Sequence, residues 1–352
     1  MTQTTIHNLH DLTRPEIVSL LDSWGYSEYH ARVLWDQLYR ELAGGFEAIP
    51  ILRDDLRKHL YQSASLTTLQ VTDEVQSVDG LATKYLFSLN DGETVESVLM
   101  HYAKRATACI STQVGCAMGC VFCATGQMGF IRHLWPGEIV GQLLHIARQL
   151  DSRGERLRNV VLMGMGEPLH NYTATMKAID IITEHHGLSI GPRYITLSTV
   201  GIPSMIRRIA DENRLFNLAV SLHAATDDER NQLVPTGKKW PLIEIIDACR
   251  YYIDKLDRRV FFEWALIEGK NDSPQHAHTV GRLLQNLNAH VNLIPLNLTH
   301  GYGGNPSNKV AAGTFQAILA DYGLPSTIRQ RRGIDINAGC GQLRADKERL
   351  LP

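Results

Sequence analysis

Three cysteines stand close together about a third of the way along the chain, at a spacing that suits metal chemistry. They are Cys116, Cys120 and Cys123, in the segment CAMGCVFC. A C-x3-C-x2-C spacing supplies three thiolates for three corners of a cubane iron–sulfur cluster, which normally takes four cysteines, so one iron stays open to a substrate. A zinc site is the alternative, but zinc patterns usually pair C-x2-C with a second pair or with histidines. No such pair follows here.

The other three cysteines are scattered. Cys340 has a glycine on each side, which permits close approach and movement of the backbone. Cys109 lies seven residues before Cys116, inside a candidate strand, and Cys249 lies on a candidate helix. A lone cysteine is most often a small buried apolar residue, and that is our interpretation of Cys249. This distribution does not fit a secreted disulfide scaffold, so we expect a cytoplasmic protein in a reducing compartment.

Composition sets the broad class of the protein. The chain has 352 residues, 44% of them hydrophobic, with 35 Lys+Arg against 37 Asp+Glu. This is ordinary globular composition, long enough for one large domain and a smaller one. The net charge of −2 excludes nucleic-acid binding through overall charge but leaves room for a local basic site. We expect no signal peptide at MTQTTIHNLHDL and no membrane span, because no apolar run approaches the ~20 residues that a span needs.

Strand and helix patterns alternate from residue 107 onward. Short apolar runs predict six strands, at 107–113, 159–165, 194–199, 217–223, 260–267 and 290–297. Amphipathic runs predict the intervening helices, at 136–150, 173–186, 202–213, 241–256 and 274–288. Six such units imply a parallel sheet, extended at one edge by 326–332. Because most strands finish in polar or glycine-rich residues, as barrel active sites do, we predict an α/β fold with an open, partial (β/α)6 TIM-like barrel.

The first hundred residues follow a different pattern. Two helices are expected at 13–25 and 28–44, then short antiparallel strands within 67–100 around the turns Asp79-Gly80 and Asp91-Gly92. The sequence therefore predicts three parts: an N-terminal helical and β accessory domain (1–100), the barrel (101–340) and a C-terminal tail (341–352).

Six ordered blocks resemble one known family. The cysteine loop resembles that of the radical S-adenosylmethionine (SAM) enzymes, and nearly the whole chain resembles the RlmN/Cfr family of RNA methyltransferases within them. The blocks are VGCAMGCVFCATGQMGF, MGMGEPLHN, ITLSTVG, SLHA, NLIPLN and GIDINAGCGQL. The resemblance implies one 4Fe-4S cluster on Cys116, Cys120 and Cys123, and two SAM molecules per turnover.

The same resemblance implies the residues that contact SAM. A small residue lets the backbone approach the cofactor, and a carboxylate accepts hydrogen bonds from its ammonium group. The matching positions are Gly166, Glu167, Ser198, Ser221, Leu222, His223 and Asn297.

Three further positions carry the implied reaction. Cys340 takes a methyl group from one SAM and becomes S-methylcysteine, and a radical made from a second SAM removes hydrogen from that methyl. The methylene radical adds to an adenine ring carbon, and Glu96 matches the family position proposed to remove the ring proton. Cys109 then attacks the Cys340 sulfur, which releases methylated adenine and leaves a Cys109–Cys340 disulfide. A strand glutamate such as Glu96 is otherwise most often a solvated residue.

The implied activity is methylation of adenine carbon 2 in 23S rRNA and in tRNA, 3′ of the anticodon. The rival within the family is the Cfr reaction at carbon 8, and a rival of another class is a non-catalytic iron–sulfur protein that binds RNA or transfers electrons. The expected partners are both RNAs and an external, flavodoxin-like electron donor, and we expect a monomer. The run from Arg329 to Arg332 is the candidate RNA contact.

Overall fold

One ten-stranded sheet organises the molecule, which a computed structural model describes from residue 6 to residue 345. The strand order is β14-β13-β12-β11-β10-β9-β6-β5-β4-β3. Neighbours are parallel from β14 to β6 and antiparallel from β6 to β3. The two halves of the sheet therefore have different architectures, although hydrogen bonds join them without a break.

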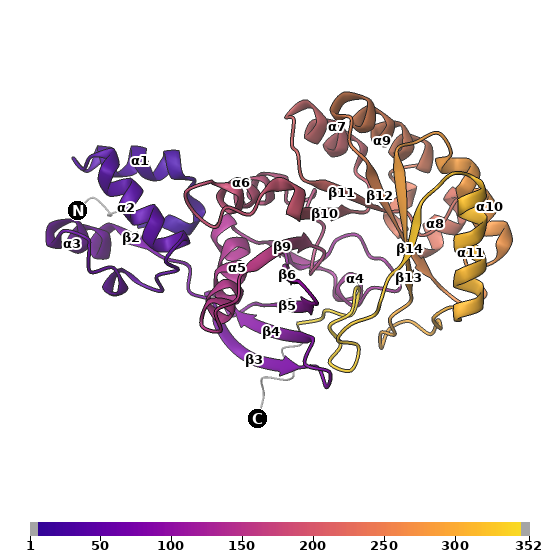
Figure 1. Ribbon diagram of the computed structural model, residues 1–352, viewed down its shortest axis with the longest axis horizontal. Helices are drawn as coiled ribbons and strands as arrows, with labels where there is room; N and C mark the ends of the chain where they lie inside the picture. The colour runs from indigo at the N-terminus through magenta and orange to yellow at the C-terminus, as the bar shows by residue number, and fades with distance from the viewer. Residues whose placement is uncertain (1–5, 346–352) are drawn as a thin grey trace.

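The parallel half is a series of strand–helix units. Its strands are β6 (Arg105–Cys109), β9 (Leu157–Leu162), β10 (Ile195–Thr199), β11 (Asn217–Ser221), β12 (Val260–Leu266), β13 (Ala289–Pro295) and β14 (Ser326–Ile328). The connecting helices are α5 (Pro136–Asp151), α6 (Tyr172–Thr183), α7 (Pro203–Asp211), α8 (Asp227–Leu233), α9 (Leu242–Leu256), α10 (Pro274–Leu284) and α11 (Lys309–Asp321). In Figure 1 the larger helices lie outside the curved strands. Six consecutive crossovers confirm the open partial barrel.

The apolar side chains of the barrel strands and helices form a common buried core. Alternate residues of β12, including Val260, Phe262 and Trp264, are fully buried, and so is Cys249 on α9. Cys249 is therefore confirmed as a core residue.

The helix α11 was not among the helices expected from the sequence, and neither was α3 (Asp54–Ser63).

The antiparallel half consists of β3 (Gln70–Gln76), β4 (Ala82–Ser88) and β5 (Thr94–Tyr102). Gly80 and Gly92 lie in the two turns with φ of 68° and 80°, backbone that favours glycine. Because β5 pairs with β6, these strands are the edge of the main sheet rather than a sheet of their own. The boundary expected at residue 100 falls inside β5, and the division into domains stays a prediction.

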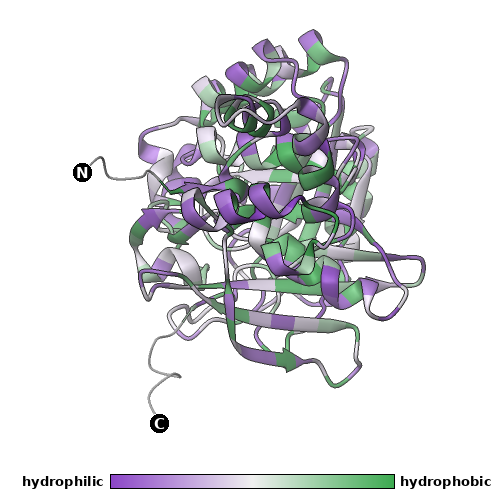
Figure 2. Ribbon diagram, turned by 90° about the vertical axis from the view of Figure 1, so that its left-hand side faces the viewer, coloured by the Kyte–Doolittle hydropathy of each residue, from purple (hydrophilic) through white to green (hydrophobic). Residues whose placement is uncertain are grey.

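The N-terminal helices α1 (Arg14–Ser23), α2 (Glu28–Tyr39) and α3 form a unit beside the barrel (Figure 1). Hydrophilic and hydrophobic residues alternate along the helices in Figure 2, as amphipathic packing requires. The short helical turn before α1, Leu9–Asp11, contacts α5 at Gly137, whose N–H donates to Asp11 Oδ1 at 2.7 Å. A Cβ on Gly137 would lie 2.5 Å from Thr67 Oγ1, so glycine permits this close approach.

The C-terminal segment returns to the antiparallel strands. Val78, in the turn between β3 and β4, donates its backbone N–H to Asp335 Oδ2 at 2.8 Å. The described residues end at 345, so most of the expected tail, 346–352, lies outside them. None of the helices within residues 6–345 has the length and apolar character that a membrane crossing requires.

Candidate active site

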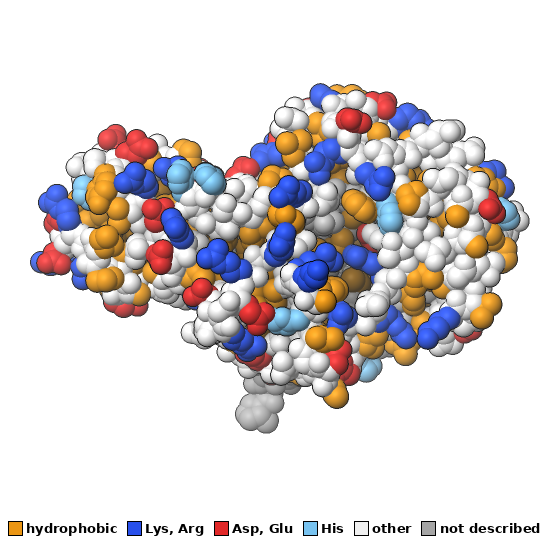
Figure 3. Space-filling view, in the orientation of Figure 1, with side chains coloured by type: hydrophobic (Ala, Val, Ile, Leu, Met, Phe, Trp, Pro, Cys, Tyr) orange, Lys and Arg blue, Asp and Glu red, His pale blue; other side chains and the backbone are white. Residues whose placement is uncertain are grey.

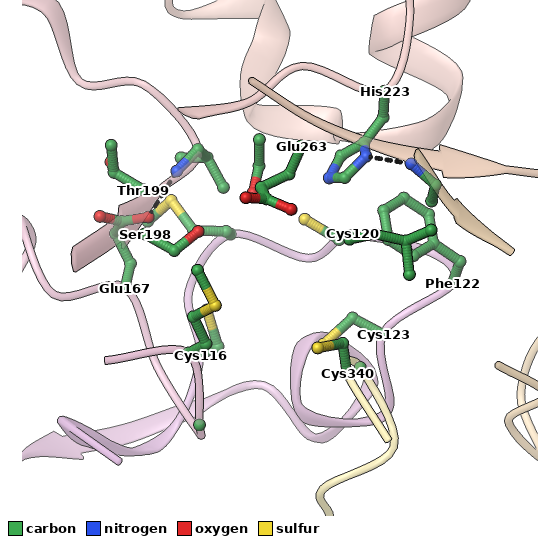
Figure 4. A pocket seen from close by; sticks show the side chains of 18 of the residues that line it. Cys116, Cys120, Phe122, Cys123, Glu167, Ser198, Thr199, His223, Glu263 and Cys340 are labelled. Carbon is green, nitrogen blue, oxygen red and sulfur yellow. Dashed lines mark hydrogen bonds between the residues drawn. The ribbon is translucent and has the colours of Figure 1, made fainter. Parts of the chain in front are cut away.

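The three clustered cysteines lie on one short loop after β7 (Gln113–Gly115), which pairs with β8 (Phe130–His133). Cys116 follows β7 directly and donates its backbone N–H to Gly129 O at 2.8 Å. Cys123 precedes α4 (Ala124–Met128), and its N–H donates to Cys120 O at 3.1 Å. All three line one cavity at the carboxyl ends of the barrel strands, and Figure 4 shows their sulfur atoms on different sides of it.

The chemistry of these donors fits an iron–sulfur cluster. Burial raises the pKa of Cys116 to about 12 and also raises the pKa values of Cys120 and Cys123. Iron would displace their protons, since a coordinating thiol is deprotonated. Within residues 6–345, no three His, Cys, Asp or Glu side chains gather closely enough to hold a single metal ion. Thiols placed around a cavity suit a multi-iron cluster, which Cys116, Cys120 and Cys123 would hold.

Gly166 and Glu167 form the next wall of this cavity. Gly166 has a φ of 102°, and a Cβ there would lie 2.6 Å from the Cβ of Gln113, so only glycine fits. Glu167 is buried, and its two oxygens accept the backbone N–H groups of Leu169 at 3.0 Å and Val200 at 2.8 Å. Burial raises its pKa to about 7, although these hydrogen bonds oppose the shift. The carboxylate therefore joins the loop after β9 to the end of β10.

Ser198, Ser221 and His223 also line the cavity, at the ends of β10 and β11. His223 has a φ of 61°, and its Nδ1 accepts the N–H of Ala265 at 3.0 Å. Burial lowers the pKa of His223 to about 3, so its imidazole is neutral. Leu222 differs from the other expected contacts because its side chain is buried in the hydrophobic core.

Cys340 joins this cavity to a second one. Its backbone O accepts from Asn297 Nδ2 at 3.0 Å, and both residues line both cavities. The second cavity also contains Cys109, at the end of β6. Burial raises the pKa of the Cys109 thiol, and the nearby Cys340 adds to the shift. Cys340, the expected methyl carrier, therefore lies between the cysteines expected to hold the cluster and Cys109, the expected resolving thiol.

Glu96 occupies a different place from the other expected residues. It is buried on β5, where its carboxylate binds Lys84 Nζ at 2.8 Å and accepts the backbone N–H of Arg344 at 2.7 Å. It is not among the residues that line the two cavities. Its role as a proton acceptor stays a prediction.

Among the residues of the first cavity that the sequence did not predict, Glu263 is the acidic one. Glu263, on β12, is buried against the first cavity, and its Oε1 accepts from Asn292 Nδ2 at 2.8 Å. Burial raises its pKa. A single charged residue inside the apolar strand VFFEWAL is the signal that could have identified it.

Comparisons with known proteins show which family the chain resembles. The Radical SAM superfamily model matches residues 110–279. The chain is 58% identical over 349 residues to "Dual-specificity RNA methyltransferase RlmN 1" of Myxococcus xanthus, covering 99% of this chain and 97% of that one. It is 43% identical over 347 residues to "Ribosomal RNA large subunit methyltransferase N" of Nitrosopumilus maritimus, covering 96% and 99%. The crystal structure of a radical SAM methyltransferase from Sphaerobacter thermophilus, 46% identical, superposes with a TM-score of 0.94 over 97% of this chain and 100% of that one.

The partial barrel and its three-cysteine loop define a radical SAM enzyme. The relatives are matched from end to end, at identities that far exceed those of proteins sharing only a fold. The chain belongs to the RlmN family of RNA methyltransferases, which confirms the family expected from the sequence.

Replacing Cys116, Cys120 or Cys123 by Ala should abolish cluster binding, because each removes one of three thiolates. Iron and sulfide analysis after anaerobic reconstitution measures this loss. Cys249→Ala is the matched control, since Cys249 is buried in the core, and it should retain the cluster. Full iron content in any of the three variants would contradict the assigned ligand set.

Gly166→Ala should weaken SAM binding about tenfold or more, because it introduces backbone strain and a close contact at the cavity wall. Isothermal titration of the reconstituted protein gives the Kd. Gly313→Ala is the control: Gly313 lies inside α11 with nothing within 4 Å of an added Cβ. It should bind SAM normally and gain up to about 1 kcal/mol of stability. Equal Kd values in the two variants would refute the role of Gly166.

Proposed function

We propose that this RNA methyltransferase methylates carbon 2 of adenine in 23S rRNA near the peptidyl-transferase centre, and in tRNA just 3′ of the anticodon. The observation that carries the proposal is the position of Cys340 in the wall between two cavities. A methyl carrier must meet SAM on one side and the RNA base on the other. The names of the matched relatives, which describe ribosomal RNA and dual-specificity enzymes, support both substrates.

The first cavity is proposed to hold the cluster and SAM. When bound, they supply a methyl group and a radical that removes hydrogen from carbon. Gly166 offers an open backbone to the methionyl part, and Glu167 offers carboxylate oxygens to its ammonium group. The loop cysteines hold the cluster, and an external one-electron donor is required to reduce it.

The second cavity is proposed to receive the target adenine. Arg105, Arg329, Arg331 and Arg332 line it beside Cys109, and Lys and Arg side chains gather around the hollow at the centre of Figure 3. Such side chains can bind phosphates while a single base enters the pocket. A protein with a net charge of −2 would thereby hold RNA at one local site.

The reaction then uses two protein thiols. The Cys340 thiolate takes the first methyl group, and after hydrogen removal its methylene bonds to the ring carbon. The ring hydrogen leaves as a proton, for which Glu96 is the proposed acceptor, and one electron passes to the external one-electron carrier as the ring regains aromaticity. Cys109 attacks the Cys340 sulfur, the carbon–sulfur bond breaks, and the released carbon takes up a proton. Two electrons from an external reductant and two protons then convert the disulfide back to both thiols.

The Cys109→Ala variant should stall as a covalent protein–RNA adduct, because it can form the carbon–carbon bond but cannot break the carbon–sulfur bond. Cys340→Ala should form neither adduct nor product, and Cys249→Ala should methylate RNA normally. Denaturing electrophoresis with labelled RNA detects the adduct. Product formation by Cys340→Ala would disprove the methyl-carrier mechanism.

Mass spectrometry of the nucleosides made by the wild-type protein identifies the methylated carbon. Carbon 2 is expected in both 23S rRNA and tRNA fragments. An 8-methyladenosine product would replace this proposal with the Cfr reaction.

Arg331→Gln should weaken RNA binding and lower the slope of log Kd against log salt by about one, as the loss of one phosphate contact does. Lys309→Gln, on the exposed start of α11, is the matched control and should leave both quantities unchanged. Filter binding at several salt concentrations measures them. An unchanged slope in Arg331→Gln would remove this residue from the RNA contact.

A further inference from the structure

The segment that carries Cys340 is held by hydrogen bonds at five consecutive residues. Cys340 O accepts from Asn297 Nδ2, and Gly341 O accepts the N–H of Ala124 at 2.7 Å. The bonds of the next three residues are Gln342 Nε2 to Leu298 O (2.9 Å), Thr125 Oγ1 to Leu343 O (2.6 Å) and Arg344 N–H to Glu96 Oε2 (2.7 Å). Three different parts of the chain therefore fix the backbone that presents the reactive thiol.

Only the last of these bonds uses an ionisable side chain. Glu96 is 3% exposed, and its other oxygen binds Lys84 Nζ at 2.8 Å, with Lys84 itself 6% exposed. The two residues lie on the neighbouring antiparallel strands β5 and β4, and Lys84 lines a further cavity together with Gln342 and Arg344. A buried carboxylate stays ionised only when a cation or hydrogen-bond donors compensate it.

We propose that Lys84 is a positioning residue that keeps Glu96 in place as the anchor of the Cys340 segment. The ammonium group of Lys84 binds Oε1 of the carboxylate and so orients Oε2 toward the Arg344 N–H. Hydrogen bonds that involve a charged group are stronger than those between neutral groups. The antiparallel edge of the sheet thereby sets where Cys340 stands between the two cavities. This inference rests on the proposed function only for the chemical role of Cys340.

The test compares Lys84→Met with the control Lys309→Met in the full-length, anaerobically reconstituted protein. Alkylation of Cys340 by iodoacetamide, followed by peptide mass spectrometry, reports how firmly the segment is held without requiring catalysis. We expect about tenfold faster alkylation in Lys84→Met, the change that loss of one charge-assisted hydrogen bond produces. S-methylation of Cys340 with SAM and no RNA should slow in the same variant.

The double variant Lys84→Met/Glu96→Gln separates anchoring from proton removal. It removes the buried charges of Lys84 and Glu96 together, and the Gln oxygen can still accept the Arg344 N–H. Alkylation of Cys340, which is an exposed residue, should therefore slow back toward the control rate, and its S-methylation should recover. RNA methylation stays lost if Glu96 is the proton acceptor. Alkylation of Cys340 at the control rate in Lys84→Met, or no recovery in a folded double variant, would overturn the inference. A wild-type protein that forms no S-methylcysteine would instead overturn the proposed function.

Discussion

The carboxyl ends of parallel strands must meet at one edge of their sheet, and the active site depends on this constraint. Cys109, the Glu167 loop, Ser198, Ser221 and Asn297 all follow or end different strands of the barrel. Each is distant from the next in sequence, yet most line the same cavity. The hydrogen bonds from Val200 and Leu169 to Glu167 then fix neighbouring strand ends relative to each other. A buried carboxylate serves well here because its several lone pairs can join two backbone segments and still face a ligand.

The antiparallel half of the sheet positions the C-terminal segment. It carries none of the three cysteines expected to hold a cluster, but it supports the backbone that carries Cys340, through Asp335 at the β3–β4 turn and through Glu96 on β5. The proposed role of Cys340 brings its thiol to SAM, a nucleobase and a second thiol in turn, and such a role needs a defined resting place. Hydrogen bonds from several elements can hold the Cys340 segment in that place. Each bond can break separately, whereas the contacts of a packed apolar core are lost together.

Positive charge is concentrated at one cavity of a molecule that is otherwise nearly neutral. The molecule as a whole is nearly neutral, so distant attraction contributes little to RNA binding. The arginines that line the second cavity concentrate positive charge beside Cys109 and Cys340. These arginines would bind RNA phosphates at the same place where a base can enter the cavity. Phosphate binding and the proposed reaction would therefore share one site.

The sequence by itself indicated the family and the fold. The alternation of strands and helices predicted the partial barrel correctly, whereas the cluster and SAM roles inferred from the spacing of Cys116, Cys120 and Cys123 and from the glycine at 166 stay predictions. The tertiary structure alone decided which distant residues meet. It joined the antiparallel strands to the barrel, turned Glu96 toward Lys84 and Arg344, and placed Glu263 in the cavity. Such pairings depend on strand register and on the path of the C-terminal segment, and no short-range pattern encodes either.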